Sequence, residues 1–249
     1  MKIFALGLLI ILSTADSPVL AQHGPSTTST TTLSVRHDGE PMLQGSGRMV
    51  RQARPVGDFT AIEVDDGIAV EITIGSARSL EAEADDNLIG RITARTDGDV
   101  LRLGMAGSYR THFIPTVRLT VPAIERIDLQ TSSDARIRGL RGGRLRLTSN
   151  GSGRFVADGW VERVSAHFTG SGDAELAALR AEDVEIVIDG NGRTSVNATR
   201  RLAATLNGSG EVIYSGNPDS VEAQVNGSGR VSPAALGVDR SGGRRGDGG

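Results

Sequence analysis

Apolar and polar residues largely alternate along this chain of 249 residues. In the first half the alternation is clearest in 59–64 and in 68–74. A two-residue period predicts strands that bury one face. Shorter segments of the same texture are 80–84, 91–95, 100–103 and 117–121. We therefore expect a β-rich portion over residues 44–121.

From residue 122 to residue 233 the alternation is organised into a repeat. Its marker is Asn-Gly-Ser-Gly or a close variant, found at 150–153, 169–172, 189–192, 207–210 and 226–229, with a degenerate copy at 130–133. The spacing between successive markers is nearly constant. Most markers follow a strand-like segment such as Val184, Ile186 and Ile188, whose apolar residues are two apart.

A fixed period of about 19 residues, with apolar and polar residues alternating within each repeat, is typical of a β-solenoid, in which each repeat is one coil. Equivalent residues of parallel neighbouring coils would then stack about 4.8 Å apart. The alternative is a set of unrelated hairpin turns in an antiparallel sandwich, because Asn-Gly is a strong hairpin signal. The constancy of the period favours the solenoid. The expected fold is all-β: a parallel β-helix-like solenoid preceded by a β-rich portion.

The marker glycines are expected at the corners of the coil, where the backbone needs angles open mainly to Gly and Asn. These structural corner glycines are Gly151, Gly153, Gly170, Gly172, Gly190, Gly192, Gly208, Gly210, Gly227 and Gly229.

The residue after each marker alternates in charge, which predicts a ladder of opposite charges along the coils. Its members are Asp134, Arg154, Asp173, Arg193, Glu211 and Arg230. One exposed ion pair contributes only about 0–1 kcal/mol. A slip by one whole coil would place like charges together, so the ladder would penalise wrong stacking. We interpret it as structural.

The N-terminus has the features of a secretory signal peptide over residues 1–21. Lys2 precedes the apolar run Ile3–Leu12, and small residues end the segment at Ala21. A membrane anchor is the weaker alternative, because the run is far shorter than the roughly 20 residues of a spanning helix. Residues 22–43 are a Ser/Thr-rich linker, 44–233 the β domain and 234–249 a flexible Gly/Arg tail. The mature chain would be periplasmic, or at the cell surface or extracellular, with no transmembrane segment.

Composition excludes several kinds of chemistry. The chain has no cysteine, and its four histidines share no metal-ligand spacing. Aromatic residues are only 3% and the net charge is −3, so neither a nucleic acid nor another polyanion is indicated as a partner. Trp160, the only tryptophan, either packs under a loop or is exposed for stacking on a sugar. We expect no catalytic, cofactor-binding or metal-binding residues and no cofactor.

A polysaccharide lyase or glycosidase is the enzyme alternative, because parallel β-helices often carry such activities. Asp134, Asp173 and Glu211 would then form a row of acids about 9.6 Å apart, two coils between neighbours. An arginine stands between each pair, however, and would keep the acids ionised, whereas a general acid needs a raised pKa.

Three features together resemble the GIN domain family of putative auto-transporter adhesins. They are the opening Gln44–Arg48, the strand pair within Val56–Ile72, and the repeated Gly-Ser-Gly corners. The likeness extends over about 45–231, with one departure at Thr131–Ser133, where the glycines are missing. It implies a right-handed parallel β-helix-like fold and an exported protein of the envelope, and it brings no catalytic residues.

The expected function is thus a non-catalytic adhesion, binding or scaffold module that presents one face of a solenoid. Its partner would be a glycan or a protein of the envelope or surface. The alternatives are the polysaccharide-active enzyme and a self-assembling envelope protein, which would form a homodimer through the C-terminal coil because its strand edges are uncapped.

Overall fold

The computed structural model describes residues 42–65, 67–130 and 132–235. The expected signal peptide, all but the last two residues of the expected linker, and all but Ala234 and Ala235 of the expected tail lie outside these residues.

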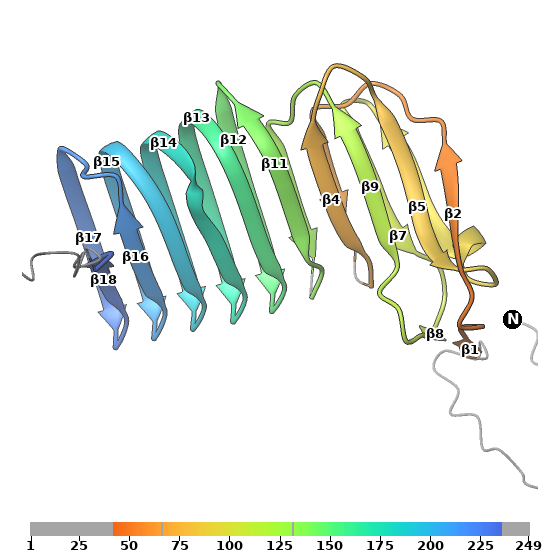
Figure 1. Cartoon of the computed structure of the whole chain (residues 1–249). Helices are drawn as coiled ribbons and strands as arrows, with labels where there is room; N and C mark the ends of the chain where they lie inside the picture. The colour runs from red at the N-terminus through yellow and green to blue at the C-terminus, as the bar shows by residue number, and fades with distance from the viewer. Residues whose placement is uncertain (1–41, 66, 131, 236–249) are drawn as a thin grey trace, which may run out of the picture. The chain divides into compact units, whose positions relative to one another are not determined.

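Almost every element is a strand, as the alternating pattern predicts (Figure 1). The elements in chain order are β1 (Leu43–Gln44), β2 (Met49–Arg54), β3 (Ala61–Val64), β4 (Ala69–Ile74), β5 (Ser79–Asp85), the 3-10 turn η1 (Ile89–Arg91), β6 (Ile92–Asp97), β7 (Val100–Met105), β8 (Tyr109–Arg110), β9 (Thr116–Val121), β10 (Arg126–Gln130), β11 (Ala135–Arg141), β12 (Arg144–Gly151), β13 (Arg154–Gly170), β14 (Asp173–Gly190), β15 (Arg193–Gly208), β16 (Glu211–Ser215), β17 (Ser220–Gly227) and β18 (Arg230–Pro233).

Pairing arranges these strands in two layers. The first layer has the order β6-β7-β3-β10-β12, continued by the second halves of β13, β14 and β15 and by β17. The second layer has the order β2-β5-β9-β4-β11, continued by the first halves of β13, β14 and β15 and by β16 and β18. The three long strands therefore bend from the second layer into the first.

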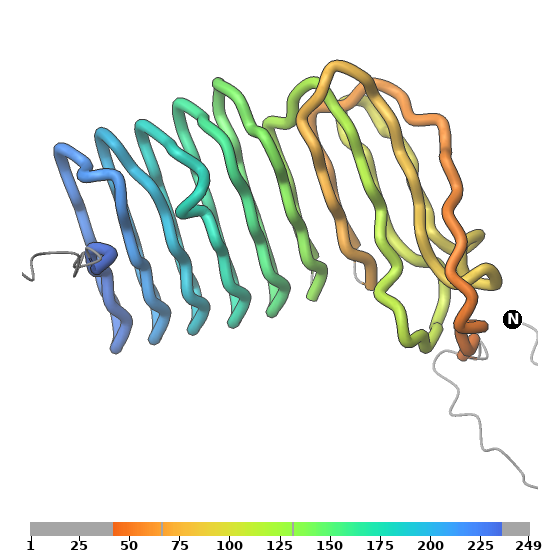
Figure 2. Tube along the Cα trace, in the orientation of Figure 1, coloured from red at the N-terminus to blue at the C-terminus, as the bar shows by residue number. Residues whose placement is uncertain are grey.

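From β10 onward the chain is a β-solenoid, which confirms the expected fold. Successive coils pair in parallel, and the first glycines of the corners align from coil to coil: Gly151 with Gly170, Gly170 with Gly190, Gly190 with Gly208, and Gly208 with Gly227. About five turns separate the corner that follows Gln130 from the corner at Gly227. Figure 2 shows these turns as similar loops of the backbone lying side by side.

Each coil has a second corner, opposite the glycine markers, and no sequence motif recurs there. In β13 the register with β11 shifts between Ile137 and Leu140, and Gly159 has a φ of 122° there. A Cβ at Gly159 would lie 2.2 Å from the carbonyl oxygen of Leu140, so only glycine fits at this bend. Bulges of this kind let one strand turn from layer to layer.

The N-terminal portion adds two coils of the same kind, but out of chain order. The coil of β3 and β4 lies between the coil of β7 and β9 and the coil of β10 and β11. Three further pairings here are antiparallel: β6 with β7 in the first layer, and β2 with β5 and β5 with β9 in the second. The short strands β1 and β8 pair in parallel and form a separate two-stranded sheet. The N-terminal portion thus adds coils to the stack and closes that end of the stack with antiparallel strands.

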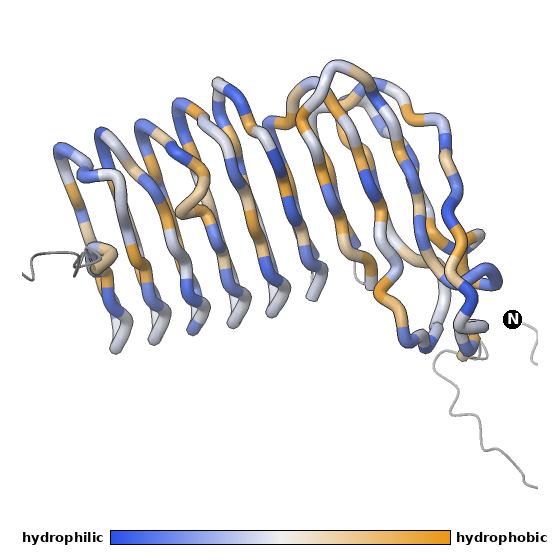
Figure 3. Tube along the Cα trace, in the orientation of Figure 1, coloured by the Kyte–Doolittle hydropathy of each residue, from blue (hydrophilic) through white to orange (hydrophobic). Residues whose placement is uncertain are grey.

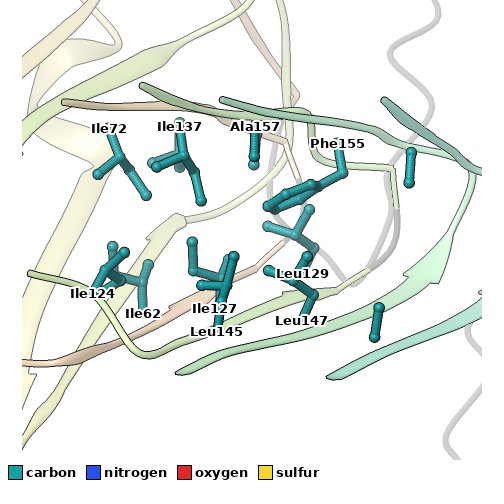
Figure 4. Close-up of a cluster of buried hydrophobic side chains, with 14 of the residues drawn as sticks. Ile62, Ile72, Ile124, Ile127, Leu129, Ile137, Leu145, Leu147, Phe155 and Ala157 are labelled. Atoms are coloured by element: carbon teal, nitrogen blue, oxygen red, sulfur yellow. The ribbon is translucent and has the colours of Figure 1, made fainter. Parts of the chain in front are cut away.

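Figure 3 shows apolar and polar residues alternating along the strands. The core lies between the two layers, because the buried residues are nearly all apolar, with Ser149 and Thr194 among the exceptions. In Figure 4, Ile72, Ile137 and Ala157 face Ile62, Ile127 and Leu145 across the interior. Stacking in register turns these residues into columns, such as Leu101, Ile62, Ile127, Leu147, Ala166, Ile186 and Ala204, all of them buried. One coil cannot bury such a column alone, so stability comes from stacking.

Candidate binding surface

The two glycines of each marker are required for different physical reasons. The first has a positive φ at all five complete corners, for example 109° at Gly170. The second has no positive φ, but a Cβ at Gly172 would lie 2.6 Å from the carbonyl oxygen of Gly153 on the preceding coil. Backbone angles therefore explain only half of the corner glycines. The other half are needed because neighbouring corners stack backbone against backbone.

The first corner, which lacks glycine, differs in its surroundings. Ser133 is buried there, and its hydroxyl donates a hydrogen bond to the carbonyl oxygen of Asp65 at 3.0 Å. Next to it the loop between β8 and β9 leaves a hollow of about 300 Å³. Phe113 and Ile114 line this hollow and are 43% and 66% exposed. It is an apolar surface feature beside the degenerate marker.

The six residues of the expected charge ladder lie in one line along the corner edge, here called the charge column. Arg154 is in register with Asp173, Arg193 with Glu211, and Glu211 with Arg230. Their contacts are of two kinds. The carboxylate oxygens of Asp134 and Asp173 accept hydrogen bonds from the backbone N–H of the next arginine along, at 2.7 and 3.0 Å.

The longer glutamate makes side-chain ion pairs instead. Glu211 lies 3.0 Å from Nε of Arg193 and 3.7 Å from Nε of Arg230. Arg154 reaches past the aspartate beside it to Glu175, at 3.5 Å. The acids of the charge column are thus held by backbone amides or by two arginines. No group of three or more His, Cys, Asp or Glu that could hold a metal ion occurs in the described residues.

A second line of polar side chains, the amide column, occupies the first marker position. Asn226 donates to Asn207 at 2.9 Å, Asn207 donates to Asp189 at 2.6 Å, and Asn150 donates to Gln130 at 3.3 Å. His167 lies 2.6 Å from the other carboxylate oxygen of Asp189. The amide of Asn207, and then His167, hold the pKa of Asp189 below its usual range.

The largest group of ion pairs lies on the outer side of the second layer, around Arg118. This guanidinium contacts Glu71, Glu81 and Glu83, and Arg51 also reaches Glu83. The hydrogen bond from Arg118 lowers the pKa of Glu83, and the same bond raises the pKa of Arg118. The cluster ties β4, β5 and β9 together across the antiparallel end of the stack.

One group of exposed residues was not singled out from the sequence. Arg136, Arg138, Arg141, Arg144 and Arg146 follow one another along β11 and β12, and we call them the arginine band. The sequence does indicate this band, because five arginines and no acid occur within residues 135–146. Trp160 lies beside the band and is 41% exposed. It is in register with Arg141 on one side and Arg180 on the other.

Among the described residues, no helix is both long enough and apolar enough to cross a membrane. None of the curated proteins compared with the chain matches it.

One solved structure shares the fold, and two more are similar to the chain at lower TM-scores. A crystal structure of a putative adhesin from Bacteroides fragilis superposes with a TM-score of 0.64 and is 21% identical, over 77% of this chain and 100% of the other. A putative adhesin from Parabacteroides merdae, 19% identical, gives a TM-score of 0.47 over 78% and 99% of the two chains. A putative lipid binding protein from Parabacteroides distasonis, 20% identical, gives 0.48 over 78% and 99%.

Family membership rests on a match to a family model rather than on the solved structures. The family model described as putative auto-transporter adhesin, head GIN domain, matches residues 58–218, which include the coil of β3 and β4 and nearly all of the solenoid. The chain therefore belongs to the putative auto-transporter adhesin, head GIN domain family.

Proposed function

We propose that this chain is an exported, non-catalytic binding protein of the cell envelope or surface, of the adhesin type. The observation that carries the proposal is the display of side chains in straight columns. Charged residues of alternating sign in the charge column, and polar residues in the amide column, recur on successive coils at the spacing of neighbouring strands, about 4.8 Å. An extended surface of this kind suits an extended partner such as a glycan or a surface protein.

The enzyme alternative finds less support in the contacts of its acids. Asp134 and Asp173 each bind a backbone amide of the next coil, and Glu211 is bridged by two arginines. Each of these carboxylates is therefore already engaged in a contact between coils.

The test is a screen of residues 22–249 on arrays of glycans and cell-wall fragments, with a parallel assay for released reducing ends. Binding without release is the expected result. Release of sugar products would overturn the non-catalytic role and favour a polysaccharide-active enzyme. Failure to bind any glycan or cell-wall fragment, or intact cells, would overturn the binding role.

Self-association is a second candidate function, favoured by the C-terminal coil. Among the described residues, β17 pairs only with β15 and β18 only with β16. Every residue of β17 is exposed, and Val221 and Val225 are 40% exposed although they continue buried columns. The opposite end of the stack is finished by antiparallel strands. A second copy meeting the first through β17 would therefore form a two-fold dimer.

Light scattering over a range of protein concentrations tests this dimer. The dimer is expected to form at micromolar concentrations and to be lost in Val225→Lys, which places a charge at the open end. Val156→Lys adds the same charge on an outward position of β13 and is expected to leave the dimer intact. A wild-type monomer at high concentration would contradict the second function.

A further inference from the structure

The arginine band differs from the other charged surfaces in lacking counter-ions. In the part of the chain that the structure describes, none of its five side chains makes an ion pair or a side-chain hydrogen bond, and all five are exposed. By contrast, Arg102, Arg163 and Arg201 on the same outer side of the first layer each pair with an acid. The band is thus an uncompensated positive surface in a chain whose net charge is −3.

The fold brings these arginines close to one another. Arg136 and Arg138 point outward from the second layer, and Arg144 and Arg146 point outward from the first layer. Arg141 lies at the second corner between them. Because β11 and β12 belong to one coil, the band continues around the edge of the stack from one outer face to the other.

On the first layer, neighbouring coils place arginines beside the band, whereas on the second layer Arg136 is in register with Glu71, which pairs with Arg118. Arg144 is in register with Arg163, and Arg146 is in register with Arg126. Like charges directly opposite one another destabilise a sheet. Arg126, Arg144, Arg146 and Arg163 line a hollow of about 440 Å³, to which Glu125 and Glu185 also contribute. Arg126 and Arg163 have acids beside them, Asp128 and Asp183. Arg144 and Arg146 have no such partner among the described residues, so a bound anion would lessen the repulsion that these two side chains experience.

Trp160 supplies an apolar surface beside the middle of the band, next to Arg141. Gly142 and Gly143 form the turn between β11 and β12, both with positive φ. A Cβ at Gly142 would lie 3.4 Å from Cζ3 of Trp160, so the indole lies over a turn that carries no side chain. The indole is 41% exposed and is flanked in register by Arg141 and Arg180, each about 4.8 Å along the stack. It is both packed on a turn and open to a ligand.

We propose that the arginine band and Trp160 bind an acidic polysaccharide, one whose sugars carry carboxylate or sulfate groups. Planar guanidinium groups bind such oxyanions with two parallel hydrogen bonds. An exposed indole can cover the apolar face of a sugar ring. Single-stranded nucleic acid fits less well, because it is bound by several aromatic platforms and the band has one aromatic residue. The inference rests on the proposed binding function and names its site and ligand class.

The experiment uses the intrinsic fluorescence of Trp160, which is the only tryptophan in the chain and therefore reports on this surface alone. Residues 22–249 are titrated with polygalacturonate (carboxylate), dextran sulfate (sulfate), neutral dextran and single-stranded oligothymidylate. At least one acidic polysaccharide is expected to change the fluorescence and saturate, with an affinity that falls as salt is added. Neutral dextran is expected to have no effect.

The decisive variant is Arg144→Ser/Arg146→Ser, which removes two exposed arginines without ion pairs. Its matched control is Arg95→Ser/Arg110→Ser, which removes two other exposed arginines that make no ion pair among the described residues. We expect about tenfold weaker binding in the band variant and less than about twofold in the control. Melting curves check that both variants fold. Trp160→Leu, followed by calorimetry, is expected to weaken binding as well.

Three results would overturn the inference. They are equal weakening by the two double variants, equal binding of neutral dextran, and tighter binding of oligothymidylate than of either acidic polysaccharide. If the array screen finds a glycan whose binding the band variant leaves unchanged, the band assignment fails while the binding function stands. If nothing binds in either experiment, both fail.

Discussion

Asp173 lies beside Arg193 on the neighbouring coil, yet its carboxylate accepts a hydrogen bond from the backbone N–H of Arg193, at 3.0 Å. The guanidinium of Arg193 reaches onward to Glu211, at 3.0 Å from Nε to Oε2. One arginine thus joins three coils, with its backbone serving one neighbour and its side chain the other. The short aspartate and the long glutamate are not interchangeable in this line.

Reversing the charge of Arg193 tests this arrangement. Arg193→Glu places an acid between Asp173 and Glu211, and we expect a loss of about 1 kcal/mol, or roughly 2–4 °C in Tm. Adding Glu211→Arg restores an opposite pair and is expected to recover part of the loss. Arg110→Glu, at an exposed position with no ion pair among the described residues, is the control. Equal melting curves for all variants would mean that the charge column contributes nothing.

The two glycines of one corner are expected to be equally intolerant of a side chain, for different reasons. Gly170→Ala adds a Cβ at a φ of 109° and 2.5 Å from the carbonyl oxygen of Gly151. Gly172→Ala meets the carbonyl oxygen of Gly153 at 2.6 Å without any strain in φ. We expect each to cost about 2 kcal/mol or more in denaturant titrations. Gly90→Ala has open space around it and should change little. A neutral Gly172→Ala would refute the role of backbone stacking.

Phe155 is expected to be a principal contributor to stability. It is buried, and its neighbours in register on the two adjacent coils are the small residues Ala135 and Ala174. Phe155→Ala would leave three alanines in a row, with a cavity that costs about 3–5 kcal/mol. Phe113→Ala removes the same group from a site that is 43% exposed and should cost much less. Chemical denaturation of the two variants gives the comparison, and similar losses would argue against the stacked core.

The pH dependence of stability should reveal Asp189. Its pKa is below the ordinary value of 3.8 because Asn207 and His167 bind the carboxylate. Since the folded form lowers the pKa, Asp189 stabilises the fold above pH about 3.8, and this contribution disappears as the pH falls through the folded pKa. Asp189→Asn should therefore lower Tm at pH 6 and have a smaller effect near pH 3. An effect of the same size at both pH values would contradict the lowered pKa.

The solenoid was predictable because its repeat leaves a trace in every coil. Aligned glycines, alternating apolar residues and a nearly constant step between markers are all consequences of stacking backbone on backbone, as the register of Gly151 with Gly170 shows. The order of the N-terminal coils was not predictable. No marker follows Val64 or Met105, and alternation alone does not say that β3 pairs with both β7 and β10.

The candidate binding surface was harder to predict than the fold. The contribution of Arg144 and Arg146 depends on their having no acid within reach and on their lying opposite Arg163 and Arg126, which is a matter of register rather than of composition. Net charge averages over the whole chain and hides such a surface. The bend at Gly159 that exposes Trp160 also lacks a motif, so the sequence left both placements of this side chain open.

The out-of-order coil of β3 and β4 restricts how such a protein can vary in length during evolution. Both edges of this coil are occupied by segments that come later in the chain, β7 and β9 on one side and β10 and β11 on the other. A duplicated repeat inserted there would have to displace pairings already made. Beyond β11 each coil contacts only the coil before and the coil after it, so the duplication or deletion of one whole coil preserves every remaining pairing. Variation in the number of coils among relatives is therefore expected on the C-terminal side of β11 only.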